Sequence, residues 1–359
     1  MTEREYLVTL YSFIPFGPAR IKLLVSYFGS AKKAWSASLG ELLKIGLKEK
    51  LVNSFMAFRH DFDEKGYFGS LRDKSIGFVT INDSDYPENL SAIDDAPPVL
   101  YMKGEVKPRD TNAIAIVGSR KMTTYGREVT ERFAGEIAGL GITVVSGLAR
   151  GVDTVAHETA LAAGGRTLAV LACGLDKIYP PENTSLAHRI VQKGALISEY
   201  PLGEPALRAN FASRNRLISG LSKAVVVVEG QEKSGTLLTA SHAAGQGRTV
   251  FAVPGQITSP LSAAPHFLIQ NGAKMVSSVK DILEELNLQL MVDKDRVEKV
   301  LPGSQEEKTL IEILTNESFH LDELARIAKI PVSEISARLT IMELKGMVRN
   351  MGGGIYKKC

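Results

Sequence analysis

Four arginines stand beside glycines or polar residues in the middle of the chain. Arg120 ends "VGSR" and Arg150 ends "SGLAR", while Arg214 and Arg216 lie in "FASRNRLISG". A guanidinium group binds phosphate through two parallel N–H donors, and a glycine turn before a helix leaves backbone N–H groups open to anions. These residues therefore predict a phosphate-binding surface.

The elements that must position the arginines alternate between strand and helix. Continuous apolar runs separated by helical patterns are typical of a parallel sheet that helices cover on both faces. We predict an α/β fold for residues 111–285, with a doubly wound, mostly parallel, Rossmann-like sheet that binds ligands beyond the carboxyl ends of its strands. The predicted strands span residues 113–117, 142–146, 167–172, 195–198, 224–229 and 249–253.

Known phosphate-binding motifs narrow the choice of polyanion. A dinucleotide fold needs G-x-G-x-x-G after its first strand, where this chain has "GSRKMT". A Walker A loop needs a lysine after its second glycine, but Thr236 follows Gly235 in "GQEKSGT". NAD and ATP are therefore disfavoured, and we expect no cofactor.

The flanks predict smaller domains. Residues 1–65 carry apolar residues at helical spacing around "PFGPA", which fits either a helix-hairpin-helix (SAM-like) unit or a small helical packing module. Residues 66–110 are acidic and irregular, and we interpret them as a connector packed on the core. A linker (286–304) leads to residues 305–359, where three helical patterns and a glycine turn predict a winged helix.

Charge and composition favour a polyanionic partner in the cytoplasm. The net charge is only +3, but residues 111–280 hold 17 basic and 11 acidic residues. Cys173 ends an apolar run and Cys359 is the last residue, so a disulfide framework is not expected. The start "MTEREYLVTL" does not resemble a signal peptide, and no apolar run is long enough to cross a membrane.

Catalytic signals are weak. Asp153 and His157 stand four residues apart in "VDTVAHETAL", and we interpret them as a helix cap and a packed histidine. The histidines show no metal-ligand spacing. We predict no catalytic residue and no metal site.

The same loops resemble the DNA-processing protein A family (DprA, also called Smf). The matching stretches include "VGSR", "SGLARGVDTVAHETAL", "GLDKIYPPEN", "FASRNRLISGLS" and "VVVVEGQEKSGTLLTASHAAGQGR", in family order over about 170 residues. The resemblance implies a protein that is not an enzyme, binds single-stranded DNA without sequence preference and forms a homodimer. It also implies loading of the recombinase RecA onto incoming single strands during natural transformation, past single-strand-binding protein.

The resemblance assigns DNA-binding roles residue by residue. Arg120 is the strongest expected contact, and a nearby ring such as Phe211 offers a base a stacking surface. After "YP", many family members carry a basic residue that contacts DNA, whereas this chain has Pro181 and Glu182, so Lys177 or Arg189 would have to substitute. Ala212 stands where proline is usual in the family. The predicted DNA-binding residues are Gly118, Ser119, Arg120, Gly147, Arg150, Phe211, Arg214, Asn215, Arg216, Lys233, Ser234, Gly235 and Thr236.

Two rival functions remain. A phosphoribohydrolase-like enzyme on a related fold would carry P-G-G-x-G-T-x-x-E, but "EKSGTLLTA" has Thr239 in place of the glutamate. A transcription factor would bind DNA through the winged helix, where Glu334 and Glu343 offset Arg338 and Lys345. A protein-contact role suits that helix better.

Overall fold

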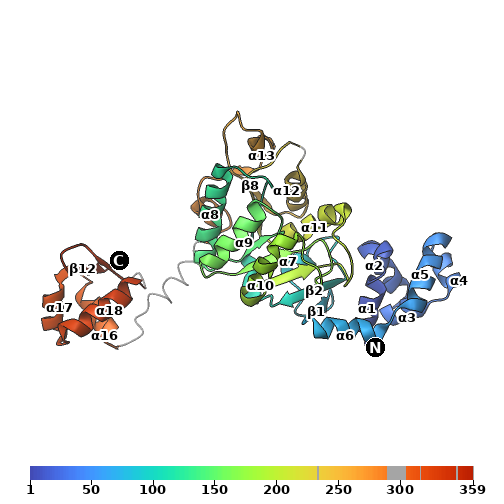
Figure 1. Cartoon of the computed structure of the whole chain (residues 1–359), viewed down its shortest axis with the longest axis horizontal. Coiled ribbons are helices and arrows are strands. Elements are labelled where there is room, and N and C mark those ends of the chain that lie inside the picture. Colours follow the sequence, from blue (N-terminus) through green and yellow to red (C-terminus); the bar gives the residue numbers. More distant parts are fainter. Residues whose placement is uncertain (233, 289–304, 316, 345–346, 359) are drawn as a thin grey trace. The chain divides into compact units, whose positions relative to one another are not determined.

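The protein is described here by a computed structural model that covers residues 1–232, 234–288, 305–315, 317–344 and 347–358 (Figure 1). The chain forms two compact units, Met1–Ile282 and Leu283–Cys359. In the described part of the chain, no helix combines the length and the apolar character needed to span a membrane.

The first unit is built on a nine-stranded sheet with the order β1-β2-β6-β5-β4-β3-β7-β8-β9. The seven strands from β3 to β9 are parallel to one another. Strands β1 and β2 extend one edge of the sheet and are antiparallel to their neighbours. All six predicted strands are present, which confirms the doubly wound α/β fold. The strands are β1 (Gly77–Thr80), β2 (Val99–Gly104), β3 (Ile114–Val117), β4 (Val144–Ser146), β5 (Thr167–Val170), β6 (Ala195–Ser198), β7 (Ala224–Val227), β8 (Thr249–Ala252) and β9 (Lys274–Met275).

Helices cover both faces of the sheet (Figure 1). The chain runs outward from β3 to β6 and then returns to place β7 on the other side of β3. Right-handed crossovers therefore put α8, α9 and α10 on one face and α11 and α12 on the other. Alternate residues of β5 follow this division, because Ala169 packs in one apolar cluster and Leu168 and Val170 in another. The helices are α8 (Thr124–Gly139), α9 (Val152–Ala162), α10 (Thr184–Lys193), α11 (Arg208–Gly220), α12 (Gly235–Gly245), α13 (Ala263–Gln270) and α14 (Val279–Glu285).

The N-terminal helices share an apolar core with the edge of the sheet. Aromatic rings hold them together, with Phe13 and Phe16 packed edge to face at 4.8 Å. Tyr11 donates a hydrogen bond of 3.0 Å to the carboxylate of Glu199 at the end of β6. The boundary at residue 65 stays a prediction, since these helices belong to the same compact unit as the sheet. They are α1 (Glu3–Tyr11), α2 (Gly17–Phe28), α3 (Ala31–Ser36), α4 (Leu39–Lys44), α5 (Glu49–Asp61) and α6 (Glu64–Asp73).

The interpretation of residues 66–110 as an irregular connector is incomplete. This segment supplies β1, the short helix α7 (Glu88–Ser91) and β2, and β2 pairs with β6 from Tyr101–Ser198 to Gly104–Ala195. Pro87, Pro97 and Pro98 lie in the turns between these elements, whereas Glu88 begins α7. Short strands flanked by such turns carry little periodic signal, which is why the sequence did not reveal them.

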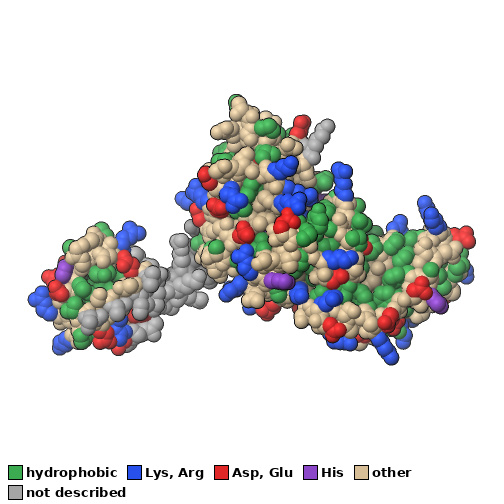
Figure 2. All heavy atoms as spheres, in the orientation of Figure 1, with side chains coloured by type: hydrophobic (Ala, Val, Ile, Leu, Met, Phe, Trp, Pro, Cys, Tyr) green, Lys and Arg blue, Asp and Glu red, His purple; other side chains and the backbone are tan. Residues whose placement is uncertain are grey.

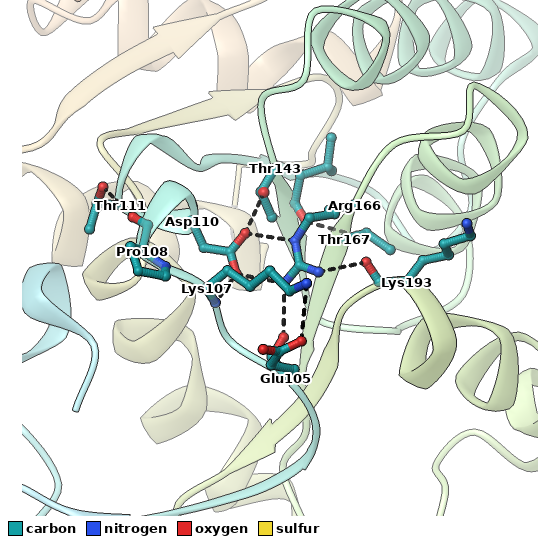
Figure 3. Close-up of polar contacts among 10 residues, drawn as sticks. Glu105, Lys107, Pro108, Asp110, Thr111, Thr143, Arg166, Thr167 and Lys193 are labelled. Atoms are coloured by element: carbon teal, nitrogen blue, oxygen red, sulfur yellow. Dashed lines mark hydrogen bonds and ion pairs between the residues drawn. The ribbon is translucent and has the colours of Figure 1, made fainter. Parts of the chain in front are cut away.

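A buried ion pair fixes the end of this segment to the amino edge of the sheet (Figure 3). Arg166, just before β5, contacts the carboxylate of Asp110 at 2.8 Å and 3.0 Å and donates to the Glu105 carbonyl at 2.8 Å. Thr143 donates a further hydrogen bond of 2.6 Å to Asp110. Burial alone would raise the pKa of Asp110, but the bonds from Arg166, Thr143 and the Lys107 backbone together lower it.

The second unit is a winged helix, as predicted. Three helices among its described residues enclose a small apolar core that includes Leu310, Leu324 and Leu339. The three-stranded antiparallel sheet has the order β10-β12-β11, and the predicted glycine turn joins β11 to β12. The elements are α16 (Gln305–Ile313), β10 (Phe319–His320), α17 (Leu321–Ala328), α18 (Val332–Leu344), β11 (Val348–Asn350) and β12 (Ile355–Lys358).

Candidate nucleic-acid interface

The loops that follow β3, β4 and β7 meet at the carboxyl edge of the sheet. The order of the strands reverses between β3 and β7, and the loops after these two strands contact each other, because the backbone N–H and the hydroxyl of Thr123 donate to the Glu229 carboxylate at 2.9 Å and 2.6 Å. Lys and Arg side chains gather over α8, α9 and α12 with acidic side chains among them (Figure 2).

The loops after β3 and β4 interlock through their backbones. Val152 donates its N–H to the Ser119 carbonyl at 3.2 Å. Gly151 has φ +77°, and a Cβ there would clash with that same carbonyl, so only glycine fits. This close approach holds Arg120 and Arg150 on one surface.

Asp153 shapes the loop that carries Arg150. Its buried carboxylate accepts the N–H groups of Gly147 at 3.1 Å and Ala149 at 3.3 Å. These bonds hold Leu148 in the left-handed region at φ +56°. Burial raises the pKa of Asp153, and the nearby Arg214 opposes that change. The predicted role of Asp153 as a helix cap is therefore wrong, because Gly151 precedes α9 without a side-chain cap and the Asp153 carboxylate binds the preceding loop instead.

Arg120 is exposed and lies over an aromatic surface. Its guanidinium carbon is 5.1 Å from the ring centroid of Phe211 on α11. Tyr179, which follows β5, is 43% exposed and packs its ring 5.5 Å from that of Phe211. Tyr179 was not among the predicted residues, and the available signal was an aromatic residue directly before two prolines. A cation and two rings thus lie side by side, as binding of a phosphate and a base requires.

A cavity of about 360 Å³ opens beside Arg120 between α8 and α9. Arg150 lies on its wall and forms an ion pair with Glu182. Lys121, in the same turn as Arg120, and Arg127, in α8, also line it, and neither was among the predicted residues. The cavity is therefore lined by four cations.

Arg214 is buried and does not present its charge at the surface. Its side chain donates 2.6 Å to the Val170 carbonyl and lies so close to Gly147 that a Cβ there would clash with it. Burial lowers the pKa of Arg214. The prediction of a direct phosphate contact is wrong for this residue, which instead supports the Gly147 loop from below.

Arg216 is also buried, on the side of α11 away from Arg120. It forms ion pairs with Glu199 and, at 3.3 Å, with Asp95. Burial raises the pKa of Glu199, while Arg216 and Tyr11 counteract that rise. The expectation that Arg216 contacts phosphate is therefore wrong as well, because carboxylates already neutralise it.

Four of the other predicted residues form a second group at α12: Asn215, Ser234, Gly235 and Thr236. Asn215 donates 3.2 Å to the Gly235 carbonyl, and Ser234 is the N-terminal capping residue of α12. Thr236 is buried. Lys233 lies outside the described residues. Phe211 and Asn215 stand four residues apart on α11, so one face of that helix joins this group to Arg120.

Lys177 and Arg189, the proposed substitutes for the missing basic residue after Pro180, both already have partners. Lys177 donates 2.7 Å to the Gly203 carbonyl, and Arg189 pairs with Glu158 at 3.6 Å.

The structure gives the histidine near Asp153 a packing role. His157 is fully buried and its Nδ1 lies 2.6 Å from the Thr167 hydroxyl. Burial lowers the pKa of His157 to about 3, so the ring is neutral. Within the described ranges, no three His, Cys, Asp or Glu residues are grouped closely enough to hold a metal ion.

Comparison with known proteins places this architecture in a family. The family model of DNA recombination-mediator protein A matches residues 77–287. The family model of the DprA winged helix domain matches residues 297–354. The chain belongs to the DNA recombination-mediator protein A family. Protein Smf of Synechocystis is 32% identical over 99% of both chains, and Protein Smf of Escherichia coli is 41% identical over 88% of this chain and 86% of its own.

Solved structures of the family share the fold. DNA processing protein A of Streptococcus pneumoniae aligns with a TM-score of 0.67 and 35% identity, covering 79% of this chain and 98% of that one. The Helicobacter pylori protein, solved to describe its single-stranded DNA binding mode, aligns with a TM-score of 0.53 and 30% identity over 59% of this chain and 95% of its own. The resemblance drawn from the sequence is thus confirmed.

Proposed function

We propose that this protein binds single-stranded DNA without sequence preference at the carboxyl edge of its sheet. In this proposal it acts as a recombination mediator that loads RecA onto incoming single strands during natural transformation. Family membership and the single-stranded DNA mode described for the Helicobacter pylori relative support it.

The observation that carries the proposal is the arrangement of Arg120, Phe211 and Tyr179. Arg120 has no carboxylate within ion-pair distance among the described residues, and its guanidinium group lies over a half-buried ring. A phosphate on Arg120 would bring the neighbouring base within reach of the exposed face of Tyr179. Each base stacked on an aromatic ring contributes about 1–3 kcal/mol.

Sequence-independent binding follows from which DNA groups this surface engages. Guanidinium and backbone N–H groups bind phosphates, and a ring stacks on any base, so the hydrogen-bonding edges of the bases remain free. Free base edges would let RecA pair the strand with a homologous partner. A homodimer would hold two segments of one strand and raise avidity. Displacement of single-strand-binding protein and a cytoplasmic location belong to the same proposal.

We infer a binding protein and not an enzyme. The two carboxylates of the cavity are engaged by arginines, Glu182 by Arg150 and Glu158 by Arg189 at 3.6 Å. The glutamate of a phosphoribohydrolase motif is replaced by Thr239, which is buried in α12.

Fluorescence anisotropy with labelled oligonucleotides tests the function. We expect affinity to rise with single-strand length and a log–log salt slope of about −0.7 for each neutralised phosphate. Duplex DNA of the same length should compete poorly, because the rings need unpaired bases. Equal competition by duplex, or release of adenine from AMP, would contradict the proposal.

A further inference from the structure

The four cations of the cavity between α8 and α9 differ in what they contact. Arg120 and Lys121 have no carboxylate within ion-pair distance in the described part of the chain, and Arg127 contacts Glu131 at 3.4 Å along its own helix. Arg150 alone is paired across the cavity, with Glu182 from the segment before α10. The Glu182 carboxylate therefore neutralises Arg150, which would otherwise be available to a phosphate of the DNA.

Asn183 holds Glu182 in this position. The buried Asn183 amide donates 2.9 Å to the Leu148 carbonyl and 2.9 Å to the Thr154 hydroxyl. Leu148 belongs to the same loop as Arg150, and Thr154 to the helix that follows it. The two halves of the ion pair are thus fixed to each other through the backbone, so Arg150 meets Glu182 without reorganisation of either loop.

The pair remains open to solvent and to ligands. The side chain of Arg150 is 62% exposed and that of Glu182 is 49% exposed. The hydrogen bond from Arg150 lowers the pKa of Glu182, so the carboxylate stays ionised at neutral pH. An exposed ion pair shifts an equilibrium only about 1.4- to 5-fold, so a phosphate, whose charge-assisted bonds to Arg are of the same kind, can replace the carboxylate.

We propose that Glu182 is an intramolecular competitor that occupies Arg150 and keeps the affinity for single-stranded DNA below what the four cations could give. This inference rests on the proposed function and concerns the same surface. A strand that reaches the cavity must displace Glu182 before Arg150 can hold a phosphate. Such displacement favours release of the strand, as suits a mediator that hands DNA to another protein.

The test compares Glu182→Gln with Glu158→Gln by fluorescence anisotropy on a single-stranded oligonucleotide over a salt series. Both substitutions remove one negative charge from the same cavity, but Glu158 pairs with Arg189, which does not line it. Glu182→Gln should tighten binding about two- to fivefold and steepen the log–log salt slope by up to about 0.7. Glu158→Gln should change the affinity less than about twofold.

The double variant Glu182→Gln with Arg150→Ala shows whether the gain depends on Arg150. We expect the tightening to disappear in that background, with the salt slope back at the wild-type value. Persistent tightening would mean that only overall charge matters, and weaker binding by Glu182→Gln would mean that the pair positions Arg150 for DNA; either result overturns the inference. Failure of the wild type itself to bind would instead reject the proposed function.

Discussion

Arg166 and Arg120 lie at opposite edges of the same sheet, and their partners differ. Arg166 is buried before β5, where Asp110 and two carbonyl groups engage its guanidinium group (Figure 3). Arg120 is exposed after β3 and contacts a ring. The difference indicates that a cation neutralised by a buried carboxylate serves the fold, while an exposed cation beside aromatic rings remains available for a ligand.

Arg216 shows that an arginine close in sequence to the binding surface can still serve the fold and not the ligand. It stands five residues after Phe211, yet Glu199 and Asp95 neutralise it on the other side of α11. Arg216 resembles Arg166, because both are buried and paired with carboxylates.

The largest expected effect comes from breaking the structural pair. Arg166→Ala leaves the carboxylate of Asp110 buried without its cation, which should lower the free energy of unfolding by about 3–5 kcal/mol. Urea denaturation measures the loss, and Arg109→Ala, at an exposed neighbouring arginine, is the control. Unchanged stability in Arg166→Ala would remove the distinction between the two edges.

Removing a ring at the other edge should affect binding and leave stability nearly unchanged. Tyr179→Ala should weaken single-strand binding by about 1–3 kcal/mol, whereas Tyr179→Phe keeps the stacking surface and should bind normally. Anisotropy titrations measure both, with Tyr27→Ala as the control at an exposed tyrosine of α2. Equal losses in the alanine and phenylalanine variants would point to the hydroxyl group and not to stacking.

The buried His157 predicts a pH dependence of stability that is separate from binding. Its folded pKa of about 3 lies below the ordinary value of 6.5, so between these pH values the unfolded chain binds a proton that the folded chain does not. Stability is therefore lost as pH falls below about 6.5, by about 1–2 kcal/mol between pH 7 and pH 5. In His157→Gln this part of the dependence should vanish in urea titrations at the two pH values, and an unchanged dependence would assign it to other groups.

Strand and loop patterns could be predicted from the sequence because they depend on neighbours along the chain. The buried run at β7 and the glycines around Arg120 are local signals, and both appear where expected. Strands β1 and β2 could not be found in this way, since β1 pairs with β2, and β2 joins the sheet through the distant β6.

The burial of Arg214 and Arg216 depends on partners that sequence spacing does not reveal. Glu199 is 17 residues from Arg216, and Val170 is 44 residues from Arg214. One local signal was available: "FASRNRLISG" forms the helix α11, and residues two apart on a helix point in nearly opposite directions. Arg214 and Arg216 could therefore not have faced one strand of DNA together.

The most direct test of the proposed binding surface compares Arg120→Ala with Arg132→Ala, at an exposed arginine farther along α8 that pairs with Glu136 at 3.0 Å. Single-strand affinity is measured by anisotropy and the melting temperature is measured alongside. We expect Arg120→Ala to weaken binding severalfold and to reduce the salt slope by about 0.7 with an unchanged melting temperature, and Arg132→Ala to bind nearly as wild type. Wild-type affinity in a folded Arg120→Ala variant would contradict the account.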